Sequence, residues 1–440
     1  MEANIVTLRD VPSDILGYSR DIFVYVPPSY YTNPDLRYPV VYAQDGQHIF
    51  KADSQGESWD LQHTADRLIS EEWLQEVIIV GVSSIARKRA AEYFHPKDGI
   101  GELYRMELHG DLYEKFLIEE VKPRIDREFR TMPGREHSAI LGSSAGGLVS
   151  YHIGFRRPDV FSRIGILSPF FVHVNVNEMS SREADWTELK LYNECNQKPD
   201  VRVWLDMGGA EGTILTRHAR EVADRMITSG FTPGNDLIFL HDPQAGHTQF
   251  DWGKRVSATL LYFFGRRGTP RSLEIIGRKT VGVNERGVRL YANVTYDSGF
   301  RMSLLDAAYS VDRPERLSIY EDGTLLPKDE GTAKVTVQYG GLEASCELQI
   351  VPFLAEMVEL EVKVEVPGNT PSDASIHAGF PLPKVEEGLY RGRFRLPRDL
   401  IFDVKVSRGF GSNEKRASNR RFATTHDQKL HFVVKEWEEQ

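Results

Sequence analysis

The sequence predicts a mostly parallel α/β sheet with helices on both faces, followed by two all-β sandwiches. Three observations lead to this prediction. Apolar runs of strand length alternate with segments of helical spacing in the first part of the chain. Polar or glycine-rich turns follow several of these runs, at the strand ends where open α/β sheets bind ligands. Beyond residue 268 the apolar period changes from that of a helix to that of a half-buried strand.

The first informative strand covers residues 38–44, and the turn Asp45-Gly46-Gln47-His48 follows it. The glycine allows the backbone to approach a bound molecule closely. A main-chain N–H in such a turn can donate to the oxygen of a substrate carbonyl. The N–H of Gln47 is therefore a candidate oxyanion donor, and an ordinary Asp-Gly turn is the alternative interpretation.

Residues 142–146 have the sequence Gly-Ser-Ser-Ala-Gly and lie between an apolar run of strand length and a segment of helical spacing. This is the context of a nucleophile elbow, in which a tight strand-to-helix turn holds a serine Oγ clear of the sheet. The turn needs small residues two positions on either side of the serine, and Gly142 and Gly146 meet that need. Ser144 is therefore the candidate nucleophile, and the N–H of Ala145 is the other candidate oxyanion donor.

A serine nucleophile needs a base, and the base needs an acid that orients it. In hydrolases with this elbow the acid and then the histidine follow the serine along the chain. A strand at 201–206 runs into a glycine-rich turn at 207–212, and two carboxylates stand there, Asp206 and Glu211. Glu211 lies deeper in the turn and has more reach, so it is the preferred acid, with Asp206 as the alternative.

The next strand, at 236–240, is followed by a loop that ends in His247. This loop lies just past the carboxyl end of a strand, where the base is required. His247 is therefore the candidate base. Three other histidines fit less well, because His152 and His218 lie in helical segments and His241 stands at the end of the strand itself.

Six further segments occur in order around the elbow: RDIFVYVPPSY at 20–30, YPVVYAQDGQ at 38–47, VIIVGV at 77–82, RAAEY at 89–93, EEVKPRID at 119–126 and RPDVF at 157–161. Through this ordered set, residues 17–265 resemble the putative-esterase family of α/β-hydrolases. That family includes enterochelin (siderophore) esterases, feruloyl esterases and the relatives of esterase D. The resemblance depends on the whole set rather than on any one segment.

The resemblance implies an α/β-hydrolase fold and a serine ester hydrolase that needs no metal or other cofactor. Glu92 and Tyr93 match the family's Arg/Glu-Tyr loop, and we expect them at the substrate pocket. The segment between Ser168 and Pro199 is expected to wall the same pocket. Ala145 departs from the family, where many relatives carry Met. That change alters a side chain and not the backbone donor, so it should affect pocket shape more than mechanism.

The rest of the chain predicts two further domains. The segment at 265–270 has the composition of a linker. Residues 269–352 resemble bacterial Ig-like domains through YEDGTL and EGTAKV. Through NTP at 369–371 and KVSRGFGSNEK at 405–415, residues 353–440 resemble a starch-binding type of sandwich. Trp437 is the only tryptophan beyond Trp252, so the aromatic platforms typical of sugar binding are scarce. The expected domains are therefore 1–268, 269–352 and 353–440.

Composition limits the partners and the compartment. The net charge of −10 argues against nucleic acid as the main partner, and no apolar run has the roughly 20 residues of a membrane helix. Cys195 and Cys346 fall in different predicted domains, and the first residues lack a leader pattern. These features favour the cytoplasm. Ig-like and sugar-binding-like modules often accompany exported enzymes, however, and a leader removed from the chain would reconcile the two.

The sequence therefore predicts a serine carboxylic-ester hydrolase that uses Ser144, Glu211 and His247. Its expected partner is a small-molecule or glycan-linked ester, such as a siderophore or carbohydrate ester. The alternative is a catalytically inactive hydrolase scaffold that serves as a glycan-binding protein, and the intact set of three residues argues against it. Because this set precedes residue 268, a chain that ends near Gly268 is expected to keep its activity on small esters.

Overall fold

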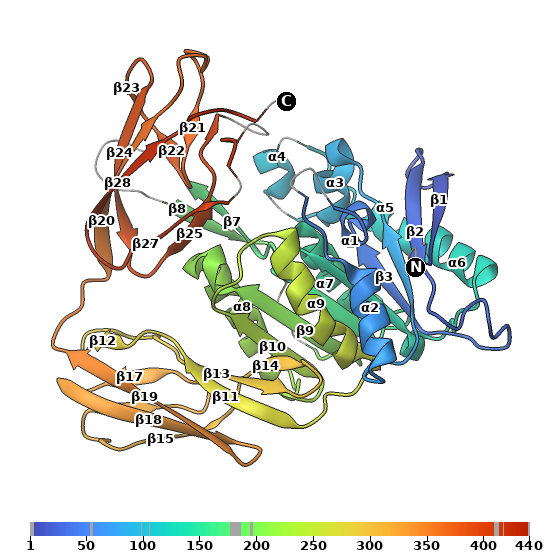
Figure 1. The fold of residues 1–440 in the computed structure, drawn as a ribbon, viewed down its shortest axis with the longest axis horizontal. Helices are drawn as coiled ribbons and strands as arrows, with labels where there is room; N and C mark the ends of the chain where they lie inside the picture. The colour runs from blue at the N-terminus through green and yellow to red at the C-terminus, as the bar shows by residue number, and fades with distance from the viewer. Residues whose placement is uncertain are drawn as a thin grey trace.

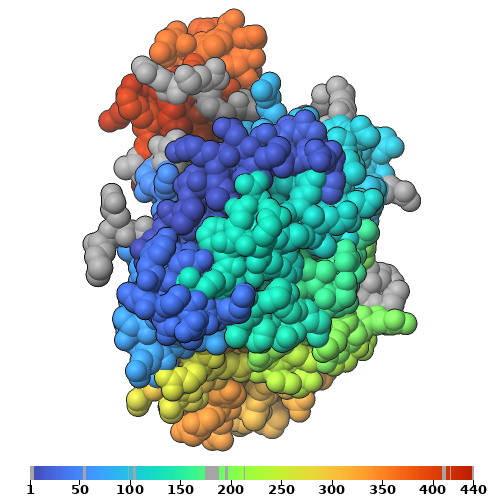
Figure 2. Space-filling model, turned by 90° about the vertical axis from the view of Figure 1, so that its right-hand side faces the viewer, coloured from blue at the N-terminus to red at the C-terminus, as the bar shows by residue number. Residues whose placement is uncertain are grey.

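A computed structural model describes residues 4–52, 56–97, 99–104, 106–176, 186–193, 197–408, 413–416 and 418–438. We refer to an N-terminal region up to residue 268, a middle region at 269–352 and a C-terminal region from 353 onward. Figure 1 shows the N-terminal region as a sheet covered by helices, and the other two regions as strands. In Figure 2 the middle and C-terminal regions lie at opposite ends of the N-terminal region.

The N-terminal region is built on a mostly parallel sheet. Its strands, in spatial order, are β1 (Ile5–Val11), β2 (Arg20–Tyr25), β4 (Ile78–Val82), β3 (Val40–Gln44), β5 (Ser138–Ser143), β6 (Arg163–Leu167), β9 (Arg202–Gly208) and β10 (Leu237–Asp242). The strands from β4 to β10 pair in parallel, whereas β1 and β2 are antiparallel. β3, β4 and β5 are buried along their whole length. This explains their continuous apolar runs, since helices cover both faces of a parallel sheet.

Helices α6 (Lys122–Glu128), α7 (Ala145–Arg156) and α8 (Thr213–Thr228) contribute to the apolar core on one face of the sheet. Helices α2 (Leu61–Ser70) and α9 (Gln249–Phe264) contribute to the core on the other face. The predicted fold class, an α/β-hydrolase sheet with helices on both faces and all-β structure after it, is confirmed. No helix in the described part of the chain is long and apolar enough to cross a membrane.

The sheet continues beyond residue 268. β14 (Arg301–Leu304) pairs antiparallel with β10, and β13 (Tyr291–Tyr296) and β11 (Pro270–Ile276) extend the sheet to 11 strands. Their apolar side chains join the core that α9 covers. The expected boundary at residue 268 therefore falls inside a continuous sheet, and the division into domains stays a prediction.

The remaining strands form smaller sheets. In the middle region these are β12 (Thr280–Gly282), β19 (Leu342–Val351), β18 (Gly331–Tyr339) and β15 (Ala308–Val311), with the pair β16 (Leu317–Ile319) and β17 (Leu325–Pro327). In the C-terminal region they are β23 (Lys384–Glu386), β24 (Leu389–Pro397), β20 (Met357–Glu365) and β28 (Gln428–Val433), then β22 (Pro381–Leu382), β21 (Ile376–His377) and β26 (Ser407–Arg408), and the pair β25 (Ile401–Val404) and β27 (Arg420–Ala423). Each region has an apolar cluster of its own. Cys346 lies in β19 as a free thiol, and Cys195 lies outside the described residues.

Candidate active site

Ser144 lies on the tight turn between β5 and α7. Its φ of 58° and ψ of −126° are unusual for a residue with a side chain, and such backbone strain costs on the order of 1–3 kcal/mol. Gly142 is required for the turn, because a Cβ there would lie 2.4 Å from the carbonyl oxygen of Gly146. The turn places Ser144 at the beginning of α7, where the helix dipole favours negative charge.

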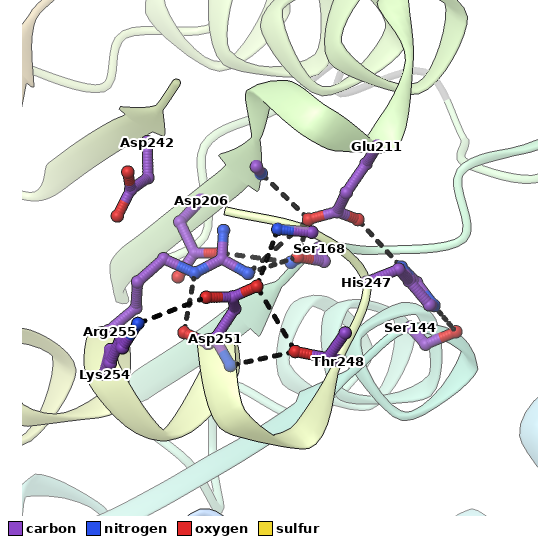
Figure 3. Close-up of polar contacts among 12 residues, drawn as sticks. Ser144, Ser168, Asp206, Glu211, Asp242, His247, Thr248, Asp251, Lys254 and Arg255 are labelled. Atoms are coloured by element: carbon purple, nitrogen blue, oxygen red, sulfur yellow. Dashed lines mark hydrogen bonds and ion pairs between the residues drawn. The ribbon is translucent and has the colours of Figure 1, made fainter. Parts of the chain in front are cut away.

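His247 lies in the loop between β10 and α9 and joins Ser144 to Glu211 (Figure 3). Its Nε2 is 2.9 Å from Oγ of Ser144, and its Nδ1 is 2.7 Å from Oε2 of Glu211. In a neutral imidazole protonated on Nδ1, Ser144 donates to Nε2 and Nδ1–H donates to Glu211. The imidazole is 40% exposed, so a substrate can reach it from solvent.

Glu211 ends η3 (Gly209–Glu211), a short helix that follows β9, and its side chain is fully buried. Oε1 accepts from the N–H of Gly208 at 2.9 Å and from the hydroxyl of Ser168 at 2.6 Å. These two donors hold the carboxylate so that Oε2 faces His247. Burial opposes ionisation of this carboxyl, but the hydrogen bond from His247 and the nearby positive charges lower its pKa. The group facing the imidazole is therefore a carboxylate anion.

Asp206 has a different environment. It is fully buried on β9, accepts from the indole N–H of Trp204 at 2.8 Å, and lies 3.0 Å from a guanidinium nitrogen of Arg255. Burial raises the pKa of Asp206 to about 6, although Arg255 and the Trp204 N–H act in the opposite direction. The structure brings Glu211 to His247 and keeps Asp206 in this interior pair.

Arg255 and Ser168 support the site, and neither was predicted from the sequence as a functional residue. Arg255 lies on α9 with no exposed surface on its side chain, and its Nη2 donates to Oγ of Ser168 at 2.7 Å. Ser168 in turn donates to Glu211, so hydrogen bonds run without a break from Arg255 to Ser144. One sequence signal exists, because Arg255 shares a helical stripe with Trp252 and Thr259, which are buried.

The two candidate oxyanion donors begin neighbouring helices. Ala145 is the first residue of α7 and Gln47 the second of α1 (Gly46–Ile49), so neither N–H has an acceptor within its own helix. β3 and β5 pair side by side, which puts both turns at one sheet edge. Asp45 adopts a left-handed φ of 56° before α1 and accepts from Arg89 at 2.7 Å and 2.8 Å. This ion pair fixes the turn that carries Gln47.

Glu92 and Tyr93 end α3 (Ala86–Tyr93), and the side chains of both are fully buried. Glu92 forms an ion pair with the buried Arg20 at 2.7 Å. The hydroxyl of Tyr93 accepts from the N–H of Asp45 at 3.2 Å. In this structure Tyr93 therefore supports the turn before Gln47, and Glu92 lies behind it. Contact of either residue with substrate stays a prediction.

The segment between Ser168 and Pro199 is described in part. β7 (Val172–Val176) pairs with β8 (Trp186–Lys190) as an antiparallel ribbon. Residues 177–185 and 194–196 of the expected pocket wall lie outside the described residues. Near the start of this segment the rings of Phe170 and Phe94 meet edge to face, with centroids 6.1 Å apart.

Among the described residues, one group has the composition of a metal site. His95, Asp111 and Glu114 offer ligand atoms within 4.8 Å of one another. Arg156 already lies 3.0 Å from Asp111 and 2.9 Å from Glu114. The guanidinium of Arg156 thus already pairs with both carboxylates, and we interpret the group as an ion-pair cluster.

Comparison with known proteins identifies the family. The model of the Putative esterase family matches residues 13–261, more than half of the chain. The uncharacterized protein YjcH of Bacillus subtilis (strain 168) is 26% identical over 200 residues, which are 46% of this chain and 74% of that protein. An endo-1,4-beta-xylanase/feruloyl esterase of Xylanibacter ruminicola is 29% identical over 163 residues, 36% of this chain and 20% of that protein. A solved ferulic acid esterase is 20% identical, with a TM-score of 0.44, and the match covers 60% of this chain and 99% of that one. The chain therefore belongs to the Putative esterase family and is a carboxylic ester hydrolase.

Proposed function

We propose that the protein hydrolyses esters through an acyl-enzyme on Ser144, with His247 as the base and Glu211 as the orienting acid. The observation that carries this proposal is the hydrogen-bonded chain from Ser144 through His247 to Glu211. Glu211 holds the proton of the neutral imidazole on Nδ1, which leaves Nε2 free to accept from the serine. It also stabilises the imidazolium that forms when the serine proton is transferred.

The reaction has two balanced steps. In the first, Oγ of Ser144 bonds to the carbonyl carbon while its proton moves to Nε2 of His247, and the alcohol then leaves with that proton. In the second, a water molecule gives its proton to Nε2 and attacks the acyl-enzyme, and Ser144 recovers a proton as the acid departs. The N–H groups of Gln47 and Ala145 receive the negative charge on the carbonyl oxygen in both steps. Ester hydrolysis by this route uses only these side chains and water, so we propose no cofactor.

For the substrate we propose a carbohydrate-linked or siderophore ester. The name of the Xylanibacter relative, which couples a xylanase to a feruloyl esterase, supports the first. A panel that contains p-nitrophenyl, feruloyl, acetyl-xylan and siderophore esters tests the choice, and the highest kcat/KM identifies the class.

The serine mechanism is tested with a fluorophosphonate probe and the variant Ser144→Ala. We expect the wild type to be labelled and the variant to remain folded, unlabelled and at least about 10³-fold less active. Comparable turnover in the variant would remove Ser144 from the mechanism. A wild type that resists the probe and binds glycans would instead support the inactive glycan-binding scaffold.

A further inference from the structure

The C-terminal region contacts both loops that carry the proposed acid and base. β25 packs against η3, the helix that ends in Glu211. The carbonyl oxygen of Ile401 lies 3.7 Å from where a Cβ on Gly212 would stand. Nη1 of Arg421, on β27, donates to the carbonyl of Gln244 at 3.3 Å. A strand pair far from the triad in sequence thus borders the site.

Asp403 on β25 also lies close to the loop that carries His247. Its Oδ2 lies 2.9 Å from the position that a Cβ on Gly246 would take, and Gly246 directly precedes His247. Position 246 is buried, and a side chain there would push Asp403 away. The close contact between the C-terminal region and the loop of His247 therefore depends on a glycine at 246.

The carboxylate of Asp403 has no hydrogen-bond or ion-pair partner within the described part of the chain. A second carboxylate near Gly246, that of Asp251, is satisfied differently. It accepts from the N–H of Gly246 at 2.8 Å and from the hydroxyl of Thr248 at 3.2 Å, and it lies 3.8 Å from Lys254. Among the described residues no hydrogen bond or ion pair neutralises the charge of Asp403, since Arg421, opposite it on β27, donates instead to the carbonyl of Gln244.

The proton transfers of the proposed reaction indicate which part of the substrate lies near the loop of His247. His247 returns its proton to the oxygen of the leaving alcohol, so that oxygen must come within hydrogen-bond distance of Nε2. The candidate oxyanion donor Gln47 follows β3, which lies on the side of β5 away from β10 and the His247 loop. We therefore expect the alcohol half of the ester near the loop of His247, and Asp403 borders that loop at Gly246.

We infer that Asp403 is a specificity-determining residue that selects the alcohol half of the ester. This inference rests on the proposed serine esterase function. An unneutralised carboxylate attracts an ammonium or a hydroxyl donor on the alcohol and repels an alcohol that carries a negative charge. The C-terminal region supplies this charge, so it takes part in substrate choice beside the catalytic loops.

The test uses the full chain and three butyrate esters that share the acyl group and the spacing of the alcohol. The alcohols are choline, its uncharged tert-butyl analogue and isethionate, which carry positive, no and negative charge. The variants are Asp403→Asn and Asp403→Lys. Asp373→Asn is the matched control, because it removes an exposed carboxylate of the same region outside β25 and β27.

We expect the wild type to prefer the choline ester over the isethionate ester in kcat/KM. Asp403→Asn should reduce this ratio by about threefold to tenfold, and Asp403→Lys should reverse it. The uncharged ester should change by less than about twofold in kcat/KM in both variants, and the control should behave as the wild type.

Two results would overturn the inference. One is a ratio that stays the same in both Asp403 variants. The other is an equal loss on all three esters, which would mean that Asp403 only braces the loop. Failure of the proposed function looks different, because then even the wild type would hydrolyse none of the esters and resist the fluorophosphonate probe.

Discussion

The two carboxylate oxygens of Glu211 contact different groups, one of them His247 and the other two donors in the protein interior. Oε2 lies 2.7 Å from Nδ1 of His247, while Oε1 accepts from the N–H of Gly208 and the hydroxyl of Ser168. Both interior groups are donors, so Oε1 must remain an acceptor. This fixed orientation makes the side chain at position 211 sensitive even to an isosteric change.

The variant Glu211→Gln should lower kcat/KM by roughly 10³- to 10⁴-fold with little loss of folding. The amide oxygen will take the place of Oε1, because its neighbours there are donors, and the amide N–H₂ will then face Nδ1 of His247. Nδ1 must then accept a hydrogen bond from the amide, so the imidazole proton lies on Nε2. In that state Nε2 cannot accept the proton of Ser144. Steady-state rates on a p-nitrophenyl ester check this, and a loss of less than about tenfold would contradict it.

The comparison variant is Asp206→Asn, which should cost mainly stability. It removes the charge of a buried carboxylate that lies 3.0 Å from Arg255, so the guanidinium loses this ion pair. Loss of one partner in a buried pair costs about 3–5 kcal/mol. Thermal melts should therefore show the larger change for Asp206→Asn, and turnover the larger change for Glu211→Gln. The reverse pattern, in variants that still fold, would exchange the roles of the two acids.

The elbow gives a second prediction. In Gly142→Ala the new Cβ would lie 2.4 Å from the carbonyl oxygen of Gly146 and 2.8 Å from Cγ of Gln44, so the turn must move. A shift of about 1 Å in the nucleophile can cost roughly 100-fold in rate. Gly146→Ala is the graded comparison, since its nearest contacts are 3.1 Å and its loss should be smaller. Wild-type activity in Gly142→Ala would show that the turn tolerates a side chain.

How much of this site the sequence could predict depends on how local each signal is. Ser144, Glu211 and His247 each follow a recognisable strand, and the carboxyl ends of parallel strands meet at one sheet edge. Their convergence therefore follows from the pattern along the chain. The choice of Glu211 over Asp206 came from reach alone, and the contact with Arg255 that occupies Asp206 is not visible in the sequence. A buried arginine on an apolar helix face indicates a partner but does not say which one.

The contribution of residues 270–304 to the sheet could not be predicted for a different reason. Alternation with a period of two shows that a segment is a half-buried strand, and it does not show which sheet the strand joins. The pairing of β14 with β10 is fixed by contacts between distant segments, such as the rings of Trp204 and Phe300, whose centroids are 5.9 Å apart. The contact of Asp403 with the histidine loop is of the same kind.

His241 gives a prediction for acid stability. Its ring stacks on that of Tyr291, with centroids 4.4 Å apart, and burial lowers the pKa of His241 to about 4. Above pH 6.5 the ring is neutral in both the folded and the unfolded chain, so it has no effect on stability there. Below that pH His241 binds a proton in the unfolded chain, whereas in the folded protein it does so only near pH 4. The free energy of unfolding therefore falls as the pH is lowered.

The variant His241→Gln should therefore lose less stability on acidification than the wild type, by at most about 3 kcal/mol at pH 4. Denaturant unfolding at a series of pH values measures this difference. His63→Gln is the control for the loss of a surface histidine, because the side chain of His63 is 63% exposed. Parallel curves for His241→Gln and the wild type would show that His241 titrates normally in the folded protein.

The final prediction concerns a chain that ends after Gly268. From the sequence alone such a chain is expected to keep its activity on small esters, because Ser144, Glu211 and His247 all remain. The sheet changes that expectation. The cut would remove β11, β13 and β14, expose the edge of β10 and strip Phe300 and Met302 from the core that holds Trp204. It would also remove the hydroxyl of Ser303, which accepts from the N–H of His241 at 2.8 Å.

We expect this chain to be insoluble or to lose at least about 5 kcal/mol of stability, with an equal loss of activity on every ester. A chain that ends after Ala355 is the matched comparison, because it keeps all 11 strands of the sheet and lacks only the region that carries Asp403. It should remain folded, hydrolyse the uncharged butyrate ester and discriminate less between the choline and isethionate esters. Solubility, melting temperature and kcat/KM on the three esters distinguish the two chains. If the chain that ends after Gly268 were folded and fully active, the strands at 270–304 would not be needed for the stability of the sheet.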